Sequence, residues 1–273
     1  MNAAMRIVTE YNALSRVLEW RDMLSLTSAI AANAPEILRT RKLTAVDAAM
    51  SRNLTIHFDN FQIALPMADI DQILGVRNDN PTFGNLREMY ARNCYLRCLR
   101  PQRPLRAVLD LGANRGMFSL LALVTLGAET AVGVEPTAIY EPVHRLLLES
   151  NRCNPARAPR YLKFISSPSL ERQNPEQNVS IQTILREQNI ERFNLVKMDI
   201  EGHEISLFAE PEWLANVDSL CMELHPHAGE LSSIPRALDY FGFKYRLTNQ
   251  HGKPAGMPNA TFLYASCAGE LIN

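Results

Sequence analysis

The stretch Val108-Leu-Asp-Leu-Gly-Ala-Asn-Arg-Gly-Met-Phe-Ser119 decides the fold that we predict for this chain of 273 residues. It reads as a β-strand, then a turn that contains Gly112 and Gly116, and then the start of an apolar helix. Glycines let the backbone approach a ligand closely, and the first N–H groups of the helix can donate to a carboxylate. The stretch therefore predicts a strand–turn–helix unit of the nucleotide-binding type.

Strands and helices alternate on the carboxyl side of this unit. Parallel neighbours in a sheet require such crossovers, so the alternation predicts an α/β fold with a mostly parallel, doubly wound sheet. The last two strands are expected to pair as an antiparallel edge. The predicted strands cover residues 106–111, 130–135, 161–166, 194–200, 219–224, 243–247 and 261–265, and the predicted helices cover residues 117–126, 139–151, 180–188, 204–214 and 234–241.

The first hundred residues follow other patterns. Apolar residues at helical spacing predict two or more amphipathic helices before residue 38. Alternating runs on both sides of Asp59-Asn60 predict a β-hairpin, because Asp and Asn tolerate the positive φ of the turn. A helical pattern over residues 85–99 precedes two prolines, of which the second is Pro104. We therefore predict a helical and hairpin extension over residues 1–104, with a lid, substrate or dimer role, and a ligand-binding domain over residues 105–273.

Composition excludes several classes of protein. Apolar residues make up 47% and charged residues 21% of the chain, as in ordinary globular proteins. The net charge of −1 gives no long-range attraction to nucleic acid or to anionic lipid, so neither partner is expected. No long uncharged apolar run indicates a membrane span, and charges interrupt the N-terminus where a signal peptide would be apolar. Five cysteines without the paired spacings of a zinc site indicate reduced thiols and a cytoplasmic protein.

The ligand expected at the glycine turn follows from Asp110. A dinucleotide turn would need three spaced glycines, and Asp110 would place a negative charge near a pyrophosphate, which disfavours a nicotinamide dehydrogenase. S-adenosylmethionine carries an ammonium and a carboxylate but no phosphate, so it suits Asp110 and the helix terminus better. Glu135, nineteen residues past Gly116, can accept hydrogen bonds from both ribose hydroxyls. The predicted cofactor-binding residues are Asp110, Gly112, Ala113, Asn114, Gly116, Phe118, Ser119, Glu135, Pro136, Ser166 and Asp199.

A second group of charged residues follows in Leu195-Val-Lys-Met-Asp-Ile-Glu-Gly-His-Glu204. Lys197, Asp199 and Glu201 stand at alternate positions, so their side chains share one face if the strand extends that far. A strand buried on both faces rarely carries three charges without a purpose. The next strand brings His225 to the same rim. The predicted catalytic residues are Asp199, His225, Glu201 and Lys197. Lys197 also fits a structural ion pair. Glu204 is interpreted as a helix-start residue, and His227 is interpreted as a solvated loop residue.

Together these motifs resemble the FkbM family of S-adenosylmethionine-dependent methyltransferases. The matching segments are residues 110–116 with Ser119, Val134-Glu-Pro136 with Asn151, residues 197–204, and Glu223-Leu-His-Pro226. The resemblance implies a Rossmann-like class I methyltransferase fold. It also implies O-methylation of hydroxyl groups on natural products or sugars, so a small hydroxylated molecule is the expected partner, and a homodimer is compatible with the extension.

The expected reaction is in-line methyl transfer to an acceptor oxygen, assisted by Asp199 or His225 as a base, with Glu201 orienting the substrate or the base. One alternative is a metal-assisted reaction, in which Asp199, Glu201, His203 and His225 hold a divalent ion. No metal is predicted, because these acids can serve the cofactor or one another. A second alternative is a cofactor-binding module that has lost catalysis, which the intact motifs disfavour.

Overall fold

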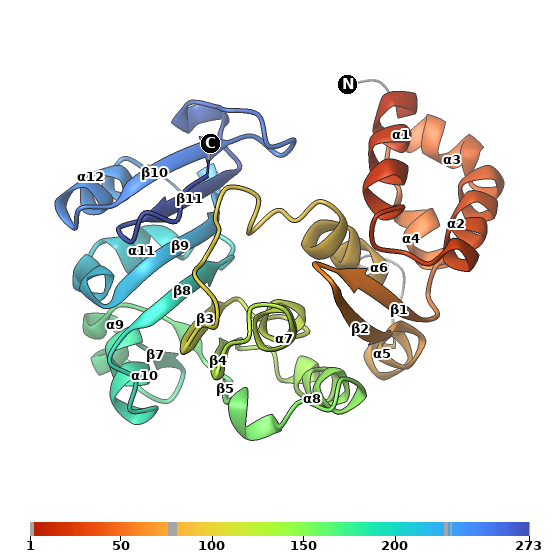
Figure 1. Ribbon diagram of the computed structural model, residues 1–273. Coiled ribbons are helices and arrows are strands. Elements are labelled where there is room, and N and C mark those ends of the chain that lie inside the picture. Colours follow the sequence, from red (N-terminus) through yellow and green to blue (C-terminus); the bar gives the residue numbers. More distant parts are fainter. Residues whose placement is uncertain (1–2, 76–80, 227–228, 230, 273) are drawn as a thin grey trace. The chain divides into compact units, whose positions relative to one another are not determined.

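The computed structural model describes residues 3–75, 81–226, 229 and 231–272 (Figure 1). The chain divides into two compact units. The N-terminal unit consists of Met1–Asn93 and Ile139–Cys153, and the core unit consists of Cys94–Ala138 and Asn154–Asn273. The first change from one unit to the other falls between Asn93 and Cys94, ahead of the boundary that the sequence suggests at Pro104. The role of the N-terminal extension as a lid, substrate-binding element or dimer face stays a prediction.

The core unit contains a seven-stranded sheet with the order β10-β11-β9-β8-β3-β4-β5. Strands β3, β4, β5, β8 and β9 run parallel, whereas β11 runs antiparallel to both β9 and β10. The predicted fold class is confirmed as a Rossmann-like, doubly wound α/β fold with an antiparallel edge, the class I methyltransferase architecture. The strands are β3 (Ala107–Leu111), β4 (Thr130–Val134), β5 (Arg160–Tyr161), β8 (Phe193–Met198), β9 (Val217–Glu223), β10 (Lys244–Thr248) and β11 (Phe262–Ser266).

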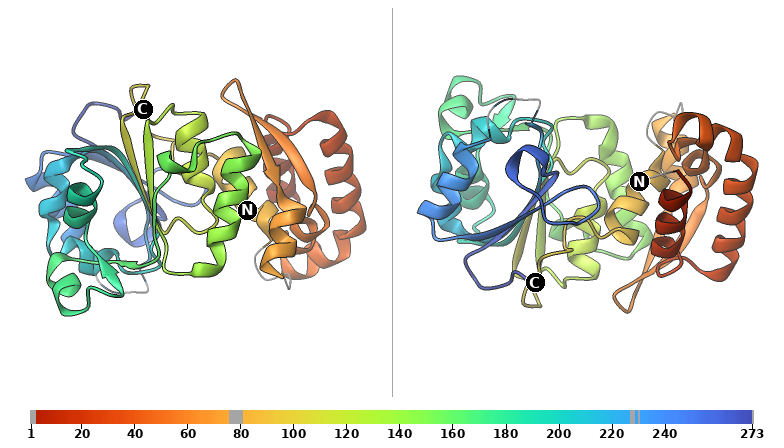
Figure 2. Two further views of the ribbon diagram at one scale, coloured as in Figure 1. Left: turned by 90° about the horizontal axis from the view of Figure 1, so that it is seen from below. Right: turned by 90° about the horizontal axis from the view of Figure 1, so that it is seen from above.

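Helices cover both faces of this sheet, as Figures 1 and 2 show. Helix α7 (Met117–Val124) lies on one face, and α10 (Ile181–Glu187), α11 (Glu204–Phe208) and α12 (Ser233–Tyr240) lie on the other. All five residues of β3 are buried, which explains its continuous apolar run around Asp110. The sheet order reverses between β3 and β8, so the carboxyl ends of these two strands form the switch point where such folds bind ligands.

Two predicted elements of the core unit are divided in the structure. The predicted strand over residues 161–166 ends in the main sheet at Tyr161, and β6 (Phe164–Ile165) pairs instead with β7 (Asn178–Val179) in a separate parallel pair. The predicted helix over residues 204–214 ends at Phe208, because Pro211 restricts the residue before it and starts a 3-10 helix, η4 (Pro211–Asn216). The sequence did not predict α9 (Pro168–Gln173), which Ser167 caps, and further 3-10 turns are η3 (Pro155–Arg157) and η6 (Met257–Asn259).

The N-terminal unit consists of helices around a two-stranded hairpin. The predicted hairpin is confirmed, since Asp59 and Asn60 have φ values of 49° and 68° and Phe58 pairs with Phe61 across the turn. The elements are α1 (Ala3–Leu14), α2 (Trp20–Ala32), α3 (Ala34–Thr40), α4 (Thr44–Ala49), β1 (Asn53–Phe58), β2 (Phe61–Pro66), α5 (Met67–Leu74), α6 (Thr82–Leu86), the π-helix η1 (Arg87–Ala91) and α8 (Glu141–Ser150), which the 3-10 turn η2 (Ala138–Tyr140) precedes.

The helix predicted over residues 85–99 is wrong beyond Ala91. Asn93 adopts a φ of 48°, which ends helical geometry, and the chain then belongs to the core unit. There the hydroxyl of Tyr264 donates a hydrogen bond to the carbonyl oxygen of Cys94. Tertiary contacts therefore override the helical spacing of this segment.

Buried polar contacts hold the N-terminal unit together. The guanidinium of Arg87 donates to both carboxylate oxygens of Asp47 at 2.7 Å and to Glu10 at 3.1 Å. Arg92 lies 3.2 Å from the other oxygen of Glu10, so two cations compensate the two carboxylates. Asn151 bonds the backbone N–H and C=O of Ala64 in β2, at 2.8 Å each. Large apolar side chains are also exposed on α1, α2 and α3; they are Met5, Val8, Trp20, Leu24 and Leu38.

Within the described part of the chain, no helix combines the length and apolar character needed to cross a bilayer. His227, which the sequence analysis interprets as a solvated loop residue, lies outside the described residues.

Candidate active site

The turn after β3 packs tightly against the end of β8. Gly112 has a φ of +72°, and a Cβ atom at this position would lie only 1.7 Å from the carbonyl oxygen of Asp199. The N–H groups of Gly112 and Ala113 donate to Val134 of β4, at 3.0 Å each. Gly116 follows with a φ of 87° and is the N-cap residue of α7. The turn is thus fixed between β4 and β8, and only glycine fits at position 112.

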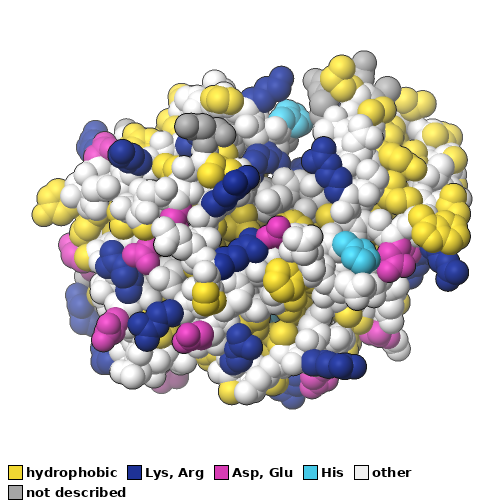
Figure 3. Space-filling model, in the orientation of Figure 1, with side chains coloured by type: hydrophobic (Ala, Val, Ile, Leu, Met, Phe, Trp, Pro, Cys, Tyr) yellow, Lys and Arg dark blue, Asp and Glu magenta, His cyan; other side chains and the backbone are white. Residues whose placement is uncertain are grey.

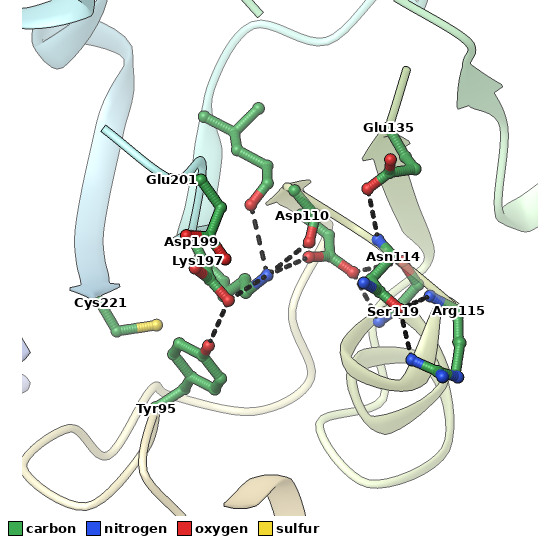
Figure 4. Close-up of polar contacts among 12 residues, drawn as sticks. Tyr95, Asp110, Asn114, Arg115, Ser119, Glu135, Lys197, Asp199, Glu201 and Cys221 are labelled. Carbon is green, nitrogen blue, oxygen red and sulfur yellow. Dashed lines mark hydrogen bonds and ion pairs between the residues drawn. The ribbon is translucent and has the colours of Figure 1, made fainter. Parts of the chain in front are cut away.

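Asp110 is fully buried beneath this turn. The N–H and the hydroxyl of Ser119 donate to its Oδ2 at 3.0 and 2.8 Å, and its Oδ1 lies 3.3 Å from Nζ of Lys197 (Figure 4). The predicted direct contact between Asp110 and a cationic aminoacyl group is therefore not supported, because both oxygens face protein groups away from solvent. Asp110 instead anchors the first turn of α7 and neutralises Lys197.

Lys197 lies in the same buried cluster. Its Nζ donates to the carbonyl oxygens of Leu111 and Gly112 at 3.3 and 2.8 Å, and it lies 3.9 Å from Oδ2 of Asp199. Burial lowers the pKa of Lys197, but the charges of Asp110 and Asp199 outweigh it, so the pKa is raised. The hydrogen bonds of Lys197 to Leu111 and Gly112 hold the turn in place, which is the structural role that its position in the sequence also allows.

Glu135 follows β4 directly and directs its carboxylate toward the turn (Figure 4). Oε2 accepts a hydrogen bond from the N–H of Asn114 at 2.9 Å, and Oε1 accepts one from the N–H of Thr137 at 3.0 Å. Each carboxylate oxygen has a second acceptor position, so ribose hydroxyls can still donate to Glu135. A tightly approaching glycine turn beside an oriented carboxylate fits the nucleoside part of S-adenosylmethionine.

Asp199 links this cofactor region to the rim of the next strand. The hydroxyl of Tyr95 donates to its Oδ2 at 2.9 Å, while Oδ1 faces Nε2 of His225 at 3.9 Å. Burial and the nearby charge of Asp199 hold the pKa of Tyr95 well above its usual range, so Tyr95 is a neutral donor. Tyr95 is not among the predicted site residues, because it lies in a segment without a motif and reaches Asp199 only through the tertiary fold.

His225 lies between three carboxylates. Its Nδ1 is 2.8 Å from Oε1 of Glu204, and its Nε2 is 3.5 Å from Oε2 of Glu201 as well as facing Asp199. The hydrogen bond to Glu204 is the largest cause that raises the pKa of His225, to about 9, against the opposing effect of burial; the charges of Glu204, Asp199 and Glu223 add to the rise.

One prediction about this rim is confirmed and another is wrong. Glu204 is the first residue of α11, as predicted, and it is in addition fully buried and bonded to His225. Strand β8 ends at Met198, so Lys197, Asp199 and Glu201 do not share one strand face. Glu201 reaches the rim through a backbone turn with a φ of 52°, and its side chain is 83% exposed. A non-glycine residue in this conformation is strained, which is frequent at functional sites.

Asp199, Glu201 and His225 also form the group of described residues that could hold a metal ion. Their ligand atoms lie within 4.8 Å of one another. His203, the fourth ligand of the metal alternative, is outside this group, and its ring lies 5.9 Å from that of Phe164. An ion at this place would have to displace the proton that the raised pKa of His225 keeps on the ring at neutral pH.

The other predicted cofactor residues differ in their surroundings. Ala113 and Phe118 are buried, and the ring of Phe118 contacts that of Tyr95 edge-on at 5.8 Å. Pro136 is half-buried beside Glu135. Ser166 is buried near the β6–β7 pair, where its hydroxyl donates to the carbonyl oxygen of Ser167. Among the described contacts of Ser166, none joins it to the cluster around Asp199, and its cofactor role stays a prediction.

Part of the chain is similar to a known protein family. Residues 160–246 match the family model of the methyltransferase FkbM domain. No curated protein sequence matches the chain.

Similar solved structures include methyltransferase FkbM from Methylobacillus flagellatus KT, with 16% identity, a TM-score of 0.42, and coverage of 72% of this chain and 58% of that one. A ribosomal protein L11 methylase from Lactobacillus delbrueckii subsp. bulgaricus has 16% identity and a TM-score of 0.39, over 60% and 70% of the two chains. A human methyltransferase 10 domain containing protein has 12% identity and a TM-score of 0.39, over 62% and 74%. The chain thus spans less than two thirds of the Methylobacillus structure. The match over residues 160–246 agrees with the resemblance predicted from the motifs: this part of the chain is similar to the methyltransferase FkbM domain, and S-adenosylmethionine is the cofactor of such methyltransferases.

Proposed function

We propose that this chain is an O-methyltransferase that methylates a hydroxyl group of a small natural product or sugar. The observation that carries the proposal is the juxtaposition of two groups at the carboxyl ends of the parallel strands. Gly112 and Glu135 provide a fitting place for the cofactor, and Asp199 and the imidazole of His225 lie 3.9 Å apart at the adjoining rim. When bound, S-adenosylmethionine supplies a methyl group on a positively charged sulfur, which keeps the electron pair of the broken bond.

The residues at the rim can orient and deprotonate an alcohol. An alcohol oxygen becomes a good nucleophile as it loses its proton, and a positioned base contributes about 10²-fold to 10⁴-fold. Nε2 of His225 and Oδ1 of Asp199 face the same space, so either atom can accept this proton. The exposed carboxylate of Glu201 can accept a hydrogen bond from a further hydroxyl of the acceptor. Alignment of the acceptor oxygen with the methyl group supplies the rest of the rate.

Single-turnover transfer of a labelled methyl group to a panel of hydroxylated metabolites and sugars tests this proposal. We expect Asp199→Asn and His225→Gln to slow transfer by about 100-fold or more. In His225→Gln, cofactor binding, measured by calorimetry, should change little. Glu212→Gln is the matched control, because Glu212 is exposed on η4 away from the rim. Unchanged rates in Asp199→Asn, His225→Gln and Glu201→Gln would remove the base assignment, and wild-type methylation of amines alone would overturn O-methylation.

Metal assistance is the second candidate, because the ligand atoms of Asp199, Glu201 and His225 lie within 4.8 Å of one another. A divalent ion there would lower the pKa of the acceptor hydroxyl. Loss of single-turnover activity on chelation, with recovery on adding Mg²⁺ or Mn²⁺, would favour this candidate. Full activity after exhaustive chelation would exclude it.

The same proposal includes three further expectations. The partner is a small hydroxylated molecule rather than nucleic acid or membrane. The N-terminal unit acts as a lid, a substrate-binding element or a dimer face, and the protein is cytoplasmic. Charges of both signs are interspersed on the face shown in Figure 3, in agreement with the net charge of −1.

A further inference from the structure

Glu204 is a buried carboxylate that the reaction described so far does not use. It is the first residue of α11, is fully buried, and places its Oε1 2.8 Å from Nδ1 of His225. Its Oε2 has no hydrogen-bond partner in the part of the chain that the structure describes. A buried carboxylate is costly unless it is paired, so the bond to His225 is the interaction that compensates the burial of Glu204.

This bond determines which nitrogen of His225 can act. An ionised carboxylate only accepts hydrogen bonds, so Nδ1 must carry a proton to bond Glu204. When the ring is neutral, the lone pair is therefore on Nε2. Nε2 is the nitrogen that faces the rim, at 3.9 Å from Oδ1 of Asp199 and 3.5 Å from Oε2 of Glu201. A carboxylate that fixes the tautomer and orientation of a catalytic imidazole is a recurrent arrangement in enzymes.

The two carboxylate oxygens of Asp199 have different neighbours. Its Oδ2 accepts a hydrogen bond from Tyr95 and lies 3.9 Å from the ammonium of Lys197, so protein groups already occupy this oxygen. Its Oδ1 is instead placed to stabilise a positive charge on His225.

We propose that Glu204 is a positioning residue that holds the Nδ1–H form of His225, so that Nε2 is the atom that takes the proton of the acceptor hydroxyl. This inference rests on the proposed O-methylation. As the acceptor oxygen forms its bond to the methyl group, its proton moves to Nε2, and Nδ1–H remains bonded to Glu204. The resulting imidazolium is flanked by Glu204 from α11, Asp199 and Glu201 after β8, and Glu223 at the end of β9.

The pH dependence of the rate distinguishes this role from a merely structural one. The same carboxylates raise the pKa of His225 to about 9, so the free enzyme holds the ring protonated at neutral pH. The rate of methyl transfer should therefore rise with pH up to about 9 in the wild type. In Glu204→Gln the largest cause of the raised pKa is removed, so the midpoint should fall by about one unit or more. The maximal rate should also fall by about tenfold or more, because the amide no longer specifies the tautomer.

The experiment combines single-turnover pH profiles with NMR of the His225 ring nitrogens in the full chain, which needs no activity. Glu204→Asp is the conservative variant and should keep a raised midpoint, while the control Glu212→Gln should match the wild type in every readout. The affinity for S-adenosylmethionine in Glu204→Gln and Glu204→Asp should stay within about twofold of the wild-type affinity.

Three results would overturn the inference. The first is a wild-type His225 that is protonated on Nε2 in its neutral form or that titrates near 6.5, the ordinary value for histidine, which is measurable even if Glu204→Gln does not fold. The second is a folded Glu204→Gln variant with the wild-type rate and midpoint. The third is a wild type that binds cofactor but methylates no hydroxyl while the His225 spectrum is as expected; this would refute the proposed function and the base role and leave the Glu204–His225 bond itself verified.

Discussion

Adding one methyl group at Gly112 should damage both stability and cofactor binding. In Gly112→Ala the new Cβ would lie 1.7 Å from the carbonyl oxygen and 2.8 Å from the carbonyl carbon of Asp199, although real contacts of this kind exceed 3.0 Å. The turn and the end of β8 must therefore separate. Forcing a methyl group into a packed site costs about 1–3 kcal/mol. The left-handed backbone, with a φ of +72°, adds about 1–2 kcal/mol for a residue with a Cβ.

The expected loss is thus about 2–5 kcal/mol in the free energy of unfolding, measured by urea denaturation. Gly242→Ala is the matched control, because Gly242 has a similar φ of +77° but no atom within 4 Å of the place that its new Cβ would take. It should lose only the backbone part, about 1–2 kcal/mol. Calorimetry should show weaker binding of S-adenosylmethionine by Gly112→Ala alone. Equal stability losses in the two variants, with unchanged cofactor affinity, would refute the close packing of the turn on β8.

Three further changes have defined outcomes. Lys197→Met leaves the buried carboxylate of Asp110 without its cation, so we expect urea denaturation to show a loss of about 3–5 kcal/mol, and a loss below about 1 kcal/mol would contradict the ion pair. In the wild type, the backbone N–H groups of Asn114 and Thr137 each donate to one carboxylate oxygen of Glu135, and Glu135→Gln leaves only one such oxygen. We therefore expect calorimetry to show that Glu135→Gln binds S-adenosylmethionine about tenfold or more weakly. Unchanged affinity would exclude Glu135 from the ribose site. Folding raises the pKa of His225 from 6.5 to about 9, so the contribution of His225 to stability is complete below pH 6.5 and is lost as the pH rises through 9. Thermal unfolding should show this loss in the wild type and much less of it in Glu204→Gln. The same dependence of the melting temperature on pH in both proteins would contradict the linkage.

The fold was largely predictable because its signals are local. The strand before Gly112, the hairpin at Asp59-Asn60 and the alternation of strands and helices each depend on neighbours in the sequence. The segment after Ala91 was not predictable in this way. Its helical spacing is real, but Cys94 and Tyr95 are held by partners about a hundred or more residues away, and such contacts leave no periodic pattern.

The candidate site was predictable in position but only partly in roles. Parallel strands bring their carboxyl ends together, so the sequence could place Glu135, Asp199 and His225 on one rim. It could not show that Asp110 is fully buried against Ser119 and Lys197, or that Glu204 turns inward to His225. A role that depends on which partner a side chain meets, rather than on its place in an element, requires the three-dimensional structure.

The most direct test of the central claim is a crystal structure of this protein with S-adenosylhomocysteine, the demethylated product. We expect the ribose hydroxyls to bond Glu135, the nucleoside to lie against the turn at Gly112, and the sulfur to be directed toward the rim that carries Asp199 and His225. A product molecule bound away from the turn, or one whose sulfur is directed away from that rim, would contradict this cofactor site.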